Sequence, residues 1–283
     1  MYTRPISRSA RTAFIIALDL SGSMNSETLA IRNSRTKAEA VCTIVNELIF
    51  ELIARARRSD RVRNYYDIAV IGYSGQGIEP LLGDDWFIPV DRLDRIRPER
   101  CTITSEAVDP NGGTLYRKIE MPRWITPRAE GRTPLYEVFS KIYDLTKQWC
   151  DTPCNAESFP PTIFNITDGE ASDADEKEVA DICERIRKLG TKDGSALLFN
   201  VHLNNASEAP AVLFPTKRDR SSMGRFGRLL YDCSSRIPSV LEERVRELNR
   251  SAEPGPFRAM SYNCSPTKAL AILTIGSCSI GIQ

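Results

Sequence analysis

Apolar residues in this chain fall into short unbroken runs that alternate with longer stretches of helical spacing. A short apolar run bounded by Gly, Pro or Ser predicts a buried strand of a parallel sheet, because helices cover both faces of such a strand. Four runs fit this pattern. The first begins at Phe14, and the others span residues 66–73, 161–167 and 196–203. Strands that alternate with helices in this way predict an α/β fold.

Between these runs the apolar residues repeat at steps of three and four, which is typical of amphipathic helices packed on a sheet. The longest such stretch ends at Ala56, next to Arg55, Arg57 and Arg58, and cations suit the carboxyl end of a helix. The spacing predicts helices over residues 38–56, 134–149, 174–189, 224–235 and 238–249, and a further helix or strand from Pro266 on.

Two of these helix starts carry recognisable capping residues. Pro134 is favoured at the first position of a helix, so Thr133 is predicted to cap the helix over 134–149 and to place its hydroxyl at the helix mouth. Ser172 and Asp175 have the spacing of a capping box, which predicts the start of the helix over 174–189.

The chain is predicted to form a single domain over residues 11–283. Its 283 residues, with 41% hydrophobic content, suffice for one large core. Residues 1–10 are basic and rich in Ser and are interpreted as a flexible lead-in. Residues from about 250 to 283 are interpreted as a C-terminal extension of the domain.

The strand and helix patterns weaken at residues 77–131, which are interpreted as an elaborated region. This stretch mixes Pro, Arg runs and the turn Asn111-Gly112-Gly113 with short alternating pieces such as 86–90. Such pieces fit edge strands or hairpins. We expect peripheral structure here, on the binding edge of the sheet, because a structureless loop of this length is unusual inside a compact domain.

Charge is balanced over the chain, with 38 Lys and Arg against 37 Asp and Glu and a formal net charge of +1. No global field therefore attracts nucleic acid or an anionic membrane. The apolar run near the start has only about eight residues, too few to cross a bilayer, and no signal-peptide cleavage site follows it. We expect a soluble, cytoplasmic protein that recognises its partners locally.

The eight cysteines are dispersed through the chain, mostly among apolar residues. Without an export signal we expect free thiols in a reducing compartment rather than a disulfide framework. Cys150 and Cys154 form the one close pair. A zinc or redox role would require a C-x-x-C repeat or a nearby His, whereas the single histidine, His202, is remote in sequence and is interpreted as a packed strand residue.

The strand that begins at Phe14 ends in a polar tip, Asp19-x-Ser21-x-Ser23. Open α/β sheets bind ligands at the carboxyl ends of their strands. Gly22 allows the backbone to turn there, so one carboxylate and two hydroxyls can face a common centre. An all-oxygen set of this kind suits a hard divalent cation. Asp and Ser at a strand end also form ordinary turns by bonding their own backbone, and these residues alone leave that alternative open.

The strand over 161–167 repeats this arrangement, since it is an apolar run followed by Asp168 and Gly169. Parallel strands end at the same edge of a sheet, so Asp168 is expected to lie at the edge that carries Asp19. Thr133, at the mouth of its predicted helix, adds a third hydroxyl. The polar residues at these strand and helix ends are Asp19, Ser21, Ser23, Thr133 and Asp168.

With these five residues taken together, the chain resembles the von Willebrand factor A (vWA) domain family. The resemblance is carried by three separated motifs, DLSGSM, GRTP and TDGE, which occur in the family's order over roughly residues 11–250. It implies a Rossmann-like, doubly wound, mostly parallel sheet with helices on both faces and one antiparallel edge strand. It also implies a metal-ion-dependent adhesion site (MIDAS) built from the loops that carry the three motifs.

The resemblance implies a role for each of these residues. Ser21 and Ser23 would bind Mg²⁺ directly, with Mn²⁺ as the other candidate. Thr133 would join them in the ligand-competent state, and Asp19 and Asp168 would act through water or exchange into direct contact. One coordination position would stay open for an Asp or Glu of a protein partner. The predicted function is metal-dependent protein–protein interaction.

Catalysis is not predicted. The alternatives are a scaffold whose metal site is structural, or a metal-dependent phosphohydrolase of haloacid-dehalogenase-like topology, in which a strand-end Asp accepts the phosphoryl group. Such hydrolases carry a second Asp two residues after the first, where this chain has Ser21. A Ser21 nucleophile would lack an activating partner, and the sequence contains no G-x-x-x-x-G-K-[ST] phosphate loop.

The signal-free chain with unpaired cysteines resembles intracellular bacterial members of the vWA family. Those members work beside AAA+ ATPases, protein kinase and phosphatase sets, or stress and defence proteins such as the tellurium-resistance group. These are the partner classes that the resemblance implies, and the motifs do not distinguish among them.

Overall fold

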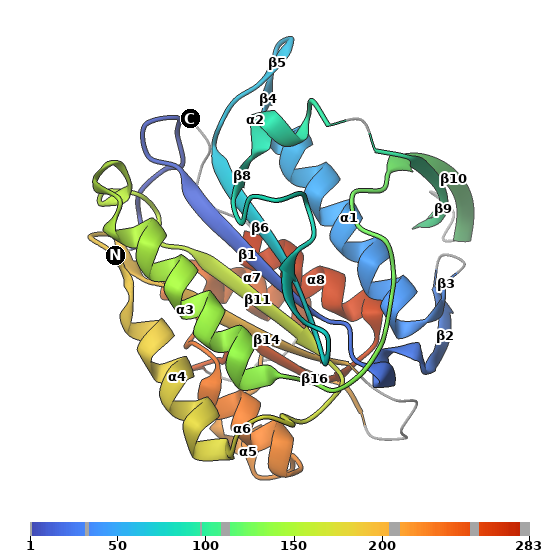
Figure 1. Cartoon of the computed structure of the whole chain (residues 1–283), viewed down its shortest axis with the longest axis vertical. Helices are drawn as coiled ribbons and strands as arrows, with labels where there is room; N and C mark the ends of the chain where they lie inside the picture. The colour runs from blue at the N-terminus through green and yellow to red at the C-terminus, as the bar shows by residue number, and fades with distance from the viewer. Residues whose placement is uncertain are drawn as a thin grey trace.

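A central mixed sheet divides the molecule, and helices lie on both of its faces (Figure 1). The computed structural model describes residues 2–31, 34–96, 98–108, 114–203, 210–249 and 255–277. The architecture is α/β, as the alternation of strand and helix patterns predicted, and it is Rossmann-like and doubly wound, as the family resemblance implied.

The strands of the central sheet come from the whole length of the chain. They are β1 (Thr12–Asp19), β6 (Tyr66–Ser74), β7 (Gly77–Pro80), β8 (Ile88–Pro89), β11 (Thr162–Thr167), β14 (Leu197–Leu203), β15 (Val212–Leu213) and β16 (Met260–Cys264). Their order is β15-β16-β14-β11-β1-β6-β7, and β8 also pairs with β6. The inner strands from β16 to β6 are parallel, whereas β15, β7 and β8 pair antiparallel at the edges.

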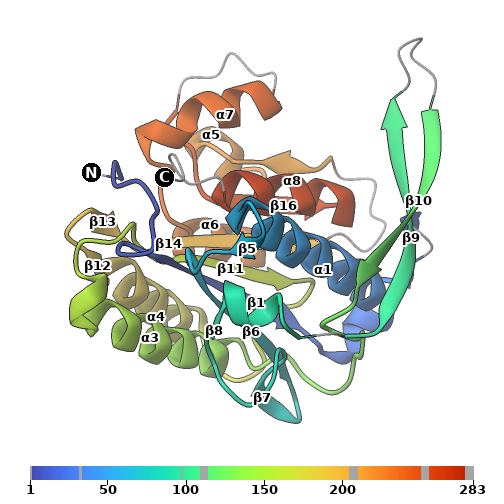
Figure 2. The same cartoon turned by 90° about the horizontal axis from the view of Figure 1, so that it is seen from above.

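Two sets of helices form the outer layers, which the view in Figure 2 separates. On one face the core contains residues of α1 (Lys37–Ala56), α7 (Ser239–Asn249), α8 (Pro266–Ser277) and the short α2 (Val90–Leu93). On the other face it contains residues of α3 (Leu135–Asp151), α4 (Glu176–Lys188) and α6 (Arg225–Cys233). The short α5 (Lys217–Arg220) precedes α6.

Side chains of β1 alternate between these two cores, as the geometry of a strand requires. Phe14, Ile16 and Leu18 pack with the α1 side, whereas Ile15 and Ala17 pack with the α3 side. All of them are buried. This explains why the strand reads as one unbroken apolar run rather than as an alternating one.

The predicted inner strands are confirmed to within one or two residues, and so are the long helices. The stretch after Pro266 is a helix rather than a strand. The sequence pattern does not predict β16, because Ser261, Tyr262 and Asn263 interrupt its apolar character. Pairing with β14 buries Ser261 nevertheless.

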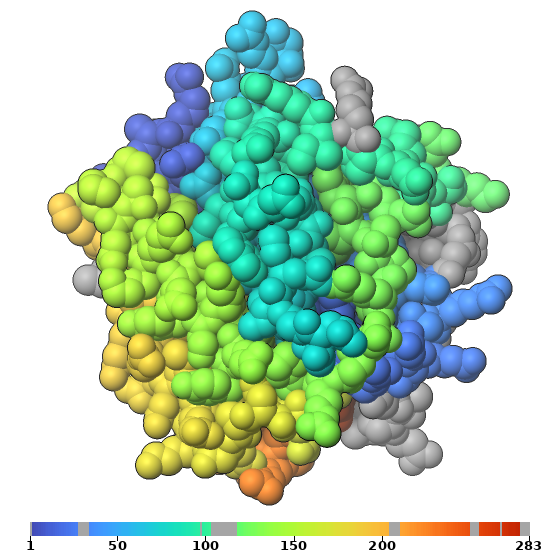
Figure 3. Space-filling view, viewed as in Figure 1, coloured from blue at the N-terminus to red at the C-terminus, as the bar shows by residue number. Residues whose placement is uncertain are grey.

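The elaborated region contains the expected edge strands and a hairpin. β7 and β8 extend the central sheet, and the segment from β7 to α2 lies across the middle of the face in Figure 3. β9 (Arg100–Val108) and β10 (Thr114–Pro122) pair with each other and project beyond α1 (Figure 2). The predicted turn at 111–113 lies outside the described residues.

Smaller hairpins decorate the connections between these elements. They are β2 (Glu27–Ile31) with β3 (Ser34–Thr36), β4 (Arg57–Arg58) with β5 (Arg61–Val62), and β12 (Gly190–Thr191) with β13 (Gly194–Ser195). The turn η2 (Pro153–Asn155) follows α3. Across the described ranges, no helix combines the length and apolar character needed to cross a membrane.

Both ends of the described chain pack onto the domain. We expected residues 1–10 to be a flexible lead-in, yet Thr3 N and Arg4 N donate to the carboxylate of Asp193 at 2.9 and 3.1 Å, and Ile6 is buried in the core. The expected C-terminal extension supplies the inner strand β16 and the helix α8. Its residues 250–254 and 278–283 lie outside the described part.

Candidate metal centre

Asp19 and Asp168 lie side by side at the carboxyl edge of the sheet. Asp19 ends β1 and Asp168 follows β11, and these strands are parallel neighbours in register up to Leu18 and Ile166. After β1 the chain crosses to β6 on one side, whereas after β11 it crosses to β14 on the other. The two connections diverge, and such a point is where open α/β sheets form a ligand-binding crevice.

The turn η1 (Gly22–Asn25) places two serines beside these carboxylates. Ser21 Oγ and Ser23 Oγ are 3.1 Å apart, and Ser23 Oγ donates to Asp168 Oδ1 at 2.6 Å. Ser21 N donates to Asp19 Oδ1 at 2.8 Å, which is the local contact that a plain turn would make. A plain turn does not account for the bond between Ser23 and Asp168, which joins residues 145 positions apart.

A third loop brings Thr133 to the same place. Gly22 N donates to Gly131 O at 2.9 Å, so the loop before α3 is bonded to the loop after β1. A Cβ atom built on Gly169 would lie 3.2 Å from Thr133 Oγ1 and 3.7 Å from Ser23 Oγ. The hydroxyls of Thr133 and Ser23 therefore face one small space, which the missing side chain of Gly169 leaves open.

Thr133 does not cap α3, and this prediction is wrong. α3 begins at Leu135, and the residue at the cap position is Pro134, which has no side-chain donor or acceptor. In the first turn of α3, the backbone amides of Tyr136 and Glu137 donate to the carboxylate of Asp173 at 3.1 and 2.9 Å. Because a residue from another loop caps the helix, the Thr133 hydroxyl is left for the crevice.

The capping box predicted from Ser172 is also wrong. α4 begins at Glu176, and Asp175 and Glu178 form its capping box. Ser172 instead donates through both N and Oγ to Thr133 O, at 3.0 and 2.9 Å. Ser172 therefore holds the Thr133 loop against the loop that follows Asp168.

Burial dominates the electrostatics of Asp19. The side chain is buried, and this raises its pKa to about 6, with a smaller effect of the same sign from Asp168. Hydrogen bonds from Ser21 and from Thr167 Oγ1, the latter at 2.6 Å, oppose the shift. Asp19 is therefore a carboxylate that gains from a nearby cation.

Lys37 is a member of this cluster that the sequence analysis did not single out. Its Nζ donates to Asp168 Oδ2 at 2.7 Å, and both side chains are fully buried. The available signal was a Lys at the start of an amphipathic helix, the end of the dipole that disfavours cations. Thr167 was also missed, although its hydroxyl immediately precedes Asp168 and bonds Asp19.

The donor set fits a hard divalent cation. Neighbouring oxygens around an octahedral Mg²⁺ lie about 3 Å apart, and the Oγ atoms of Ser21 and Ser23 have a separation of 3.1 Å. Across the described residues, no group of three or more His, Cys, Asp or Glu side chains is placed to hold a metal. A metal at this edge would therefore depend on the hydroxyls as well as on the two carboxylates.

The other candidate residues lie in ordinary packing environments. The ring of His202 is stacked on Tyr262 with 4.9 Å between centroids, its Nδ1 accepts from Asn263 N at 3.3 Å, and burial lowers its pKa to about 4. Cys150 and Cys154 are free thiols, as are the other described cysteines. This agrees with the expectation of unpaired cysteines, apart from Cys278, which lies outside the described residues.

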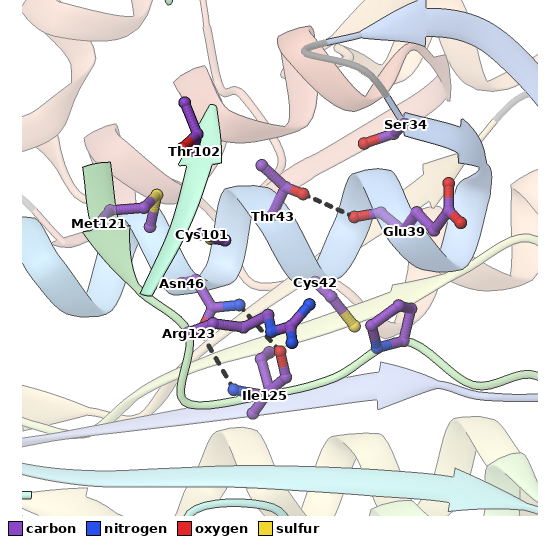
Figure 4. A pocket seen from close by; sticks show the side chains of 11 residues that line it. Ser34, Glu39, Cys42, Thr43, Asn46, Cys101, Thr102, Met121, Arg123 and Ile125 are labelled. Carbon is purple, nitrogen blue, oxygen red and sulfur yellow. Dashed lines mark hydrogen bonds between the residues drawn. The ribbon is translucent and has the colours of Figure 1, made fainter. Parts of the chain in front are cut away.

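A pocket of ≈ 250 Å³ lies elsewhere, between α1 and the base of the β9–β10 hairpin (Figure 4). Asn46 connects its walls, since its Nδ2 donates to Ile125 O at 3.0 Å and its Oδ1 accepts from Ile125 N at 3.1 Å. Cys42 lines the pocket, and burial raises the pKa of its thiol to about 12. None of the five candidate metal-binding residues lines this pocket.

The fold and the site define an α/β protein with a cluster of polar side chains at the switch point of its sheet. No protein-family model matches the chain, and no curated protein matches it. Among solved structures, a von Willebrand factor type A protein from Catenulispora acidiphila is 14% identical with a TM-score of 0.37, covering 69% of this chain and 34% of its own. The vWF domain of a type V pilus tip protein from Porphyromonas gingivalis is 10% identical with a TM-score of 0.34, covering 57% of this chain and 39% of its own.

The chain thus spans little more than a third of the length of either of these structures. Likenesses at such TM-scores are too distant to support a functional conclusion.

Proposed function

We propose that this protein is a metal-dependent protein-interaction module of the vWA type, with Mg²⁺ or Mn²⁺ at the crevice between β1 and β11. The observation that carries the proposal is the convergence of three loops far apart in sequence. Hydrogen bonds join Asp19, Ser21, Ser23 and Asp168, and Thr133 Oγ1 lies beside them, 3.2 Å from the position of a Cβ atom built on Gly169.

The arrangement of exposed and buried groups suggests how a partner would approach. Asp19 and Asp168 are buried, whereas Ser23 is exposed. A bound metal would supply an electrophilic coordination position, which suits one carboxylate oxygen of a partner's Asp or Glu. The protein's own residues would hold the metal from below, and Asp19 would also orient Ser21 through its bond to Ser21 N.

The identity of the partner is a separate part of the proposal. The resemblance to intracellular bacterial vWA proteins points to a cytoplasmic complex. The candidate partners are an AAA+ ATPase, a kinase and phosphatase set, or stress and defence proteins of the tellurium-resistance kind. We propose recognition of a local acidic side chain, since the net charge of +1 supplies no long-range field.

We also propose that the site is not catalytic. In the phosphohydrolase alternative an acid is expected two positions after the nucleophilic Asp19, and this position is Ser21, whose Oγ contacts Ser23 Oγ. Turnover of phosphoesters measured with Mg²⁺ present tests this proposal. Activity that disappears in Asp19→Ala would contradict it and favour the hydrolase.

Direct metal binding is the first experiment. We expect the purified protein to bind Mn²⁺, detected by the loss of the free-ion signal in electron paramagnetic resonance, and to bind Mg²⁺ in calorimetry. Asp19→Ala and Thr133→Ala should weaken both. Thr43→Ala is the matched control, because the Thr43 hydroxyl donates to Glu39 O of its own helix, so removing it should leave metal binding unchanged.

Partner capture tests the second half of the proposal. A tagged pulldown from the native cell in Mg²⁺ should retain a protein that EDTA releases and that Asp19→Ala fails to retain. Partners that stay bound in EDTA and with Asp19→Ala would overturn metal-bridged docking, and would favour a scaffold whose metal site is structural.

A further inference from the structure

A fully buried ion pair lies inside the candidate metal centre. Lys37 Nζ donates to Asp168 Oδ2 at 2.7 Å, and both side chains have an exposed fraction of 0%. Lys and Asp are almost never fully buried unless they are paired. Such pairs give up the hydration of two ions, so they are weak sources of stability, and a hydrophobic pair of similar volume is often as stable. The stability of the fold alone does not explain this pair.

The position of Lys37 on its helix is also unfavourable for a cation. Lys37 is the first residue of α1, where the helix dipole disfavours positive charge. The surrounding backbone is held in place, because Lys37 N donates to Ser26 O at 3.1 Å and a capping box joins Thr36 to Glu39. The fold thus directs a lysine side chain toward Asp168 in spite of the helix dipole.

The two oxygens of Asp168 have different partners. Oδ2 faces Lys37, whereas Oδ1 accepts from Ser23 Oγ at 2.6 Å, on the side of the candidate metal ligands. Asp19 and Asp168 bring two negative charges to this centre and Lys37 brings one positive charge. A divalent cation at the crevice would therefore meet a net formal charge of −1 from these three side chains rather than −2.

We propose that Lys37 is a resident counter-cation that sets the metal affinity of the crevice. By neutralising Asp168 it weakens the binding of Mg²⁺ or Mn²⁺ by the isolated protein. A partner's carboxylate would restore the missing negative charge, so metal and partner would bind cooperatively. This inference rests on the proposed metal site, and it adds a specificity-determining residue to it.

The reading that competes with this one is a purely structural ion pair. In that case replacing Lys37 would destabilise the fold equally with and without metal, and would not strengthen metal binding. If Lys37 is a counter-cation, the effect of replacing it should depend on whether the metal is bound. Removing its charge should make the metal bind more tightly, and the bound metal should then recover the stability lost from the unpaired Asp168.

The experiment compares Lys37→Gln and Lys37→Met with the wild-type protein. Gln keeps a hydrogen-bond donor for Asp168 without the charge, and it remains informative should Met prevent folding. Mn²⁺ affinity is measured by paramagnetic resonance, and thermal unfolding midpoints are measured in Mn²⁺ and in EDTA. We expect about a tenfold or greater gain in Mn²⁺ affinity, because a full charge next to the metal is removed.

Lys147→Gln is the matched control. Lys147 pairs with Asp151 on the exposed surface of α3, so the variant also removes one lysine charge from a Lys–Asp pair. We expect its Mn²⁺ affinity to equal that of the wild type. For the Lys37 variants, we expect midpoints below the wild-type value in EDTA and a larger gain on adding Mn²⁺.

The outcomes separate this inference from the proposed function. If the wild type binds Mn²⁺, Asp19→Ala loses it, and folded Lys37→Gln binds no more tightly than the wild type, the counter-cation is overturned and the metal site stands. If neither the wild type nor any Lys37 variant binds Mn²⁺, both proposals are overturned together.

Discussion

Asp19 shows how strongly a buried position changes a single side chain. It ends an otherwise apolar strand, and its carboxylate is satisfied by Ser21 N and Thr167 Oγ1 at 2.8 and 2.6 Å. Those bonds favour the charged form, but burial outweighs them and raises the pKa from 3.8 to about 6. The folded protein therefore holds this proton more tightly than the unfolded chain does.

The raised pKa of Asp19 predicts a pH dependence of stability. Asp19 stabilises the metal-free fold most below its unfolded pKa of 3.8, and this contribution is lost as the pH rises through about 6. The loss amounts to roughly 3 kcal/mol in the free energy of unfolding. Urea unfolding in EDTA from about pH 4 to pH 7 should show it as the difference between wild type and Asp19→Asn. Parallel profiles for the two proteins would contradict this prediction.

Replacing Gly169 by Ala tests whether the space beside the Thr133 and Ser23 hydroxyls is needed for metal binding. Its backbone would accept a side chain, but an Ala Cβ would lie 3.2 Å from Thr133 Oγ1 and 3.7 Å from Ser23 Oγ. We expect Gly169→Ala to stay folded and to lose metal affinity by about tenfold or more, or ~1.4 kcal/mol. Calorimetry with Mg²⁺ measures this loss.

Gly224→Ala is the control for Gly169→Ala. It introduces a methyl group 3.2 Å from Tyr262 Oη, at the start of α6. It thus creates a comparable close contact without touching the crevice, and its Mg²⁺ affinity should not change. Equal losses in both variants would point to a general loss of packing rather than to a filled metal site.

Among the helices, α1 reaches the candidate metal centre through its first residue, Lys37, which bonds Asp168. Thr36 caps this helix directly before Lys37, and its capping box with Glu39 spans Lys37. Replacing a Thr cap by Ala costs about 1 kcal/mol. We expect Thr36→Ala to lower the free energy of unfolding by that amount and also to change the Mg²⁺ affinity, since the start of α1 positions Lys37.

Asp175→Ala separates these two effects. Asp175 forms the equivalent capping box of α4, so we expect a similar loss of about 1 kcal/mol in denaturant unfolding. Mg²⁺ affinity measured in parallel should change only for Thr36→Ala. If the Mg²⁺ affinity is unchanged in both Thr36→Ala and Asp175→Ala, the Thr36 cap is not needed to position Lys37.

The strands are also joined by a chain of buried polar side chains on the face of the sheet that α6 covers. Tyr73 Oη donates to Asn165 Oδ1 at 2.8 Å, Asn165 Nδ2 donates to Asn200 Oδ1 at 3.0 Å, and Asn200 Nδ2 donates to Ser234 Oγ at 3.0 Å. These side chains are buried and connect β6, β11, β14 and the end of α6. Each hydrogen bond satisfies groups that would otherwise be left unpaired in the interior.

Removing the middle of this chain should destabilise the sheet. Asn165→Ala leaves Tyr73 Oη without its acceptor and Asn200 Oδ1 without its donor. An orphaned buried group costs about 1–3 kcal/mol, so we expect a loss of about 3 kcal/mol in urea unfolding. Gln148→Ala, at an exposed position of α3, is the control and should change stability by less than about 0.5 kcal/mol.

At the scale of the whole molecule, deleting the β9–β10 hairpin tests whether the domain needs it to fold. Arg123 N donates to Glu99 O at 2.8 Å, so the two ends of the hairpin already meet. Replacing residues 100–122 by two glycines should leave one cooperative unfolding transition and unchanged Mg²⁺ affinity, with a stability loss below about 2 kcal/mol. A chain that no longer folds would show that the hairpin belongs to the core.

At the same scale, the sheet order decides where the crevice lies. β1 is central and lies between β6 and β11. The chain continues from β1 to β6 in one direction across the sheet, and from β11 to β14 in the other. The motifs predicted that Asp19 and Asp168 would share an edge, because both follow buried strands. The family resemblance implied that the loops after these strands build one site, and the structure places β1 and β11 side by side.

Several elements were readable from the sequence because their local pattern agrees with their final environment. The apolar runs of β1, β6, β11 and β14 are buried on both faces. β16 was not readable, since its burial depends on pairing with β14 and its residues are partly polar. The caps of α3 and α4 were misread for a related reason, since a nearby hydroxyl can bond to a neighbouring loop as well as to its own helix.

The sequence by itself determined the α/β class, the buried strands, the long helices and the polar residues at two strand ends, because hydrophobic periodicity and turn chemistry are local properties. Only the tertiary structure placed Lys37 beside Asp168, assigned the cap of α3 to Asp173 and bonded Ser172 to the backbone of Thr133. Those contacts join residues far apart in the chain. Such contacts form only when the core packs, so no local sequence pattern predicts them.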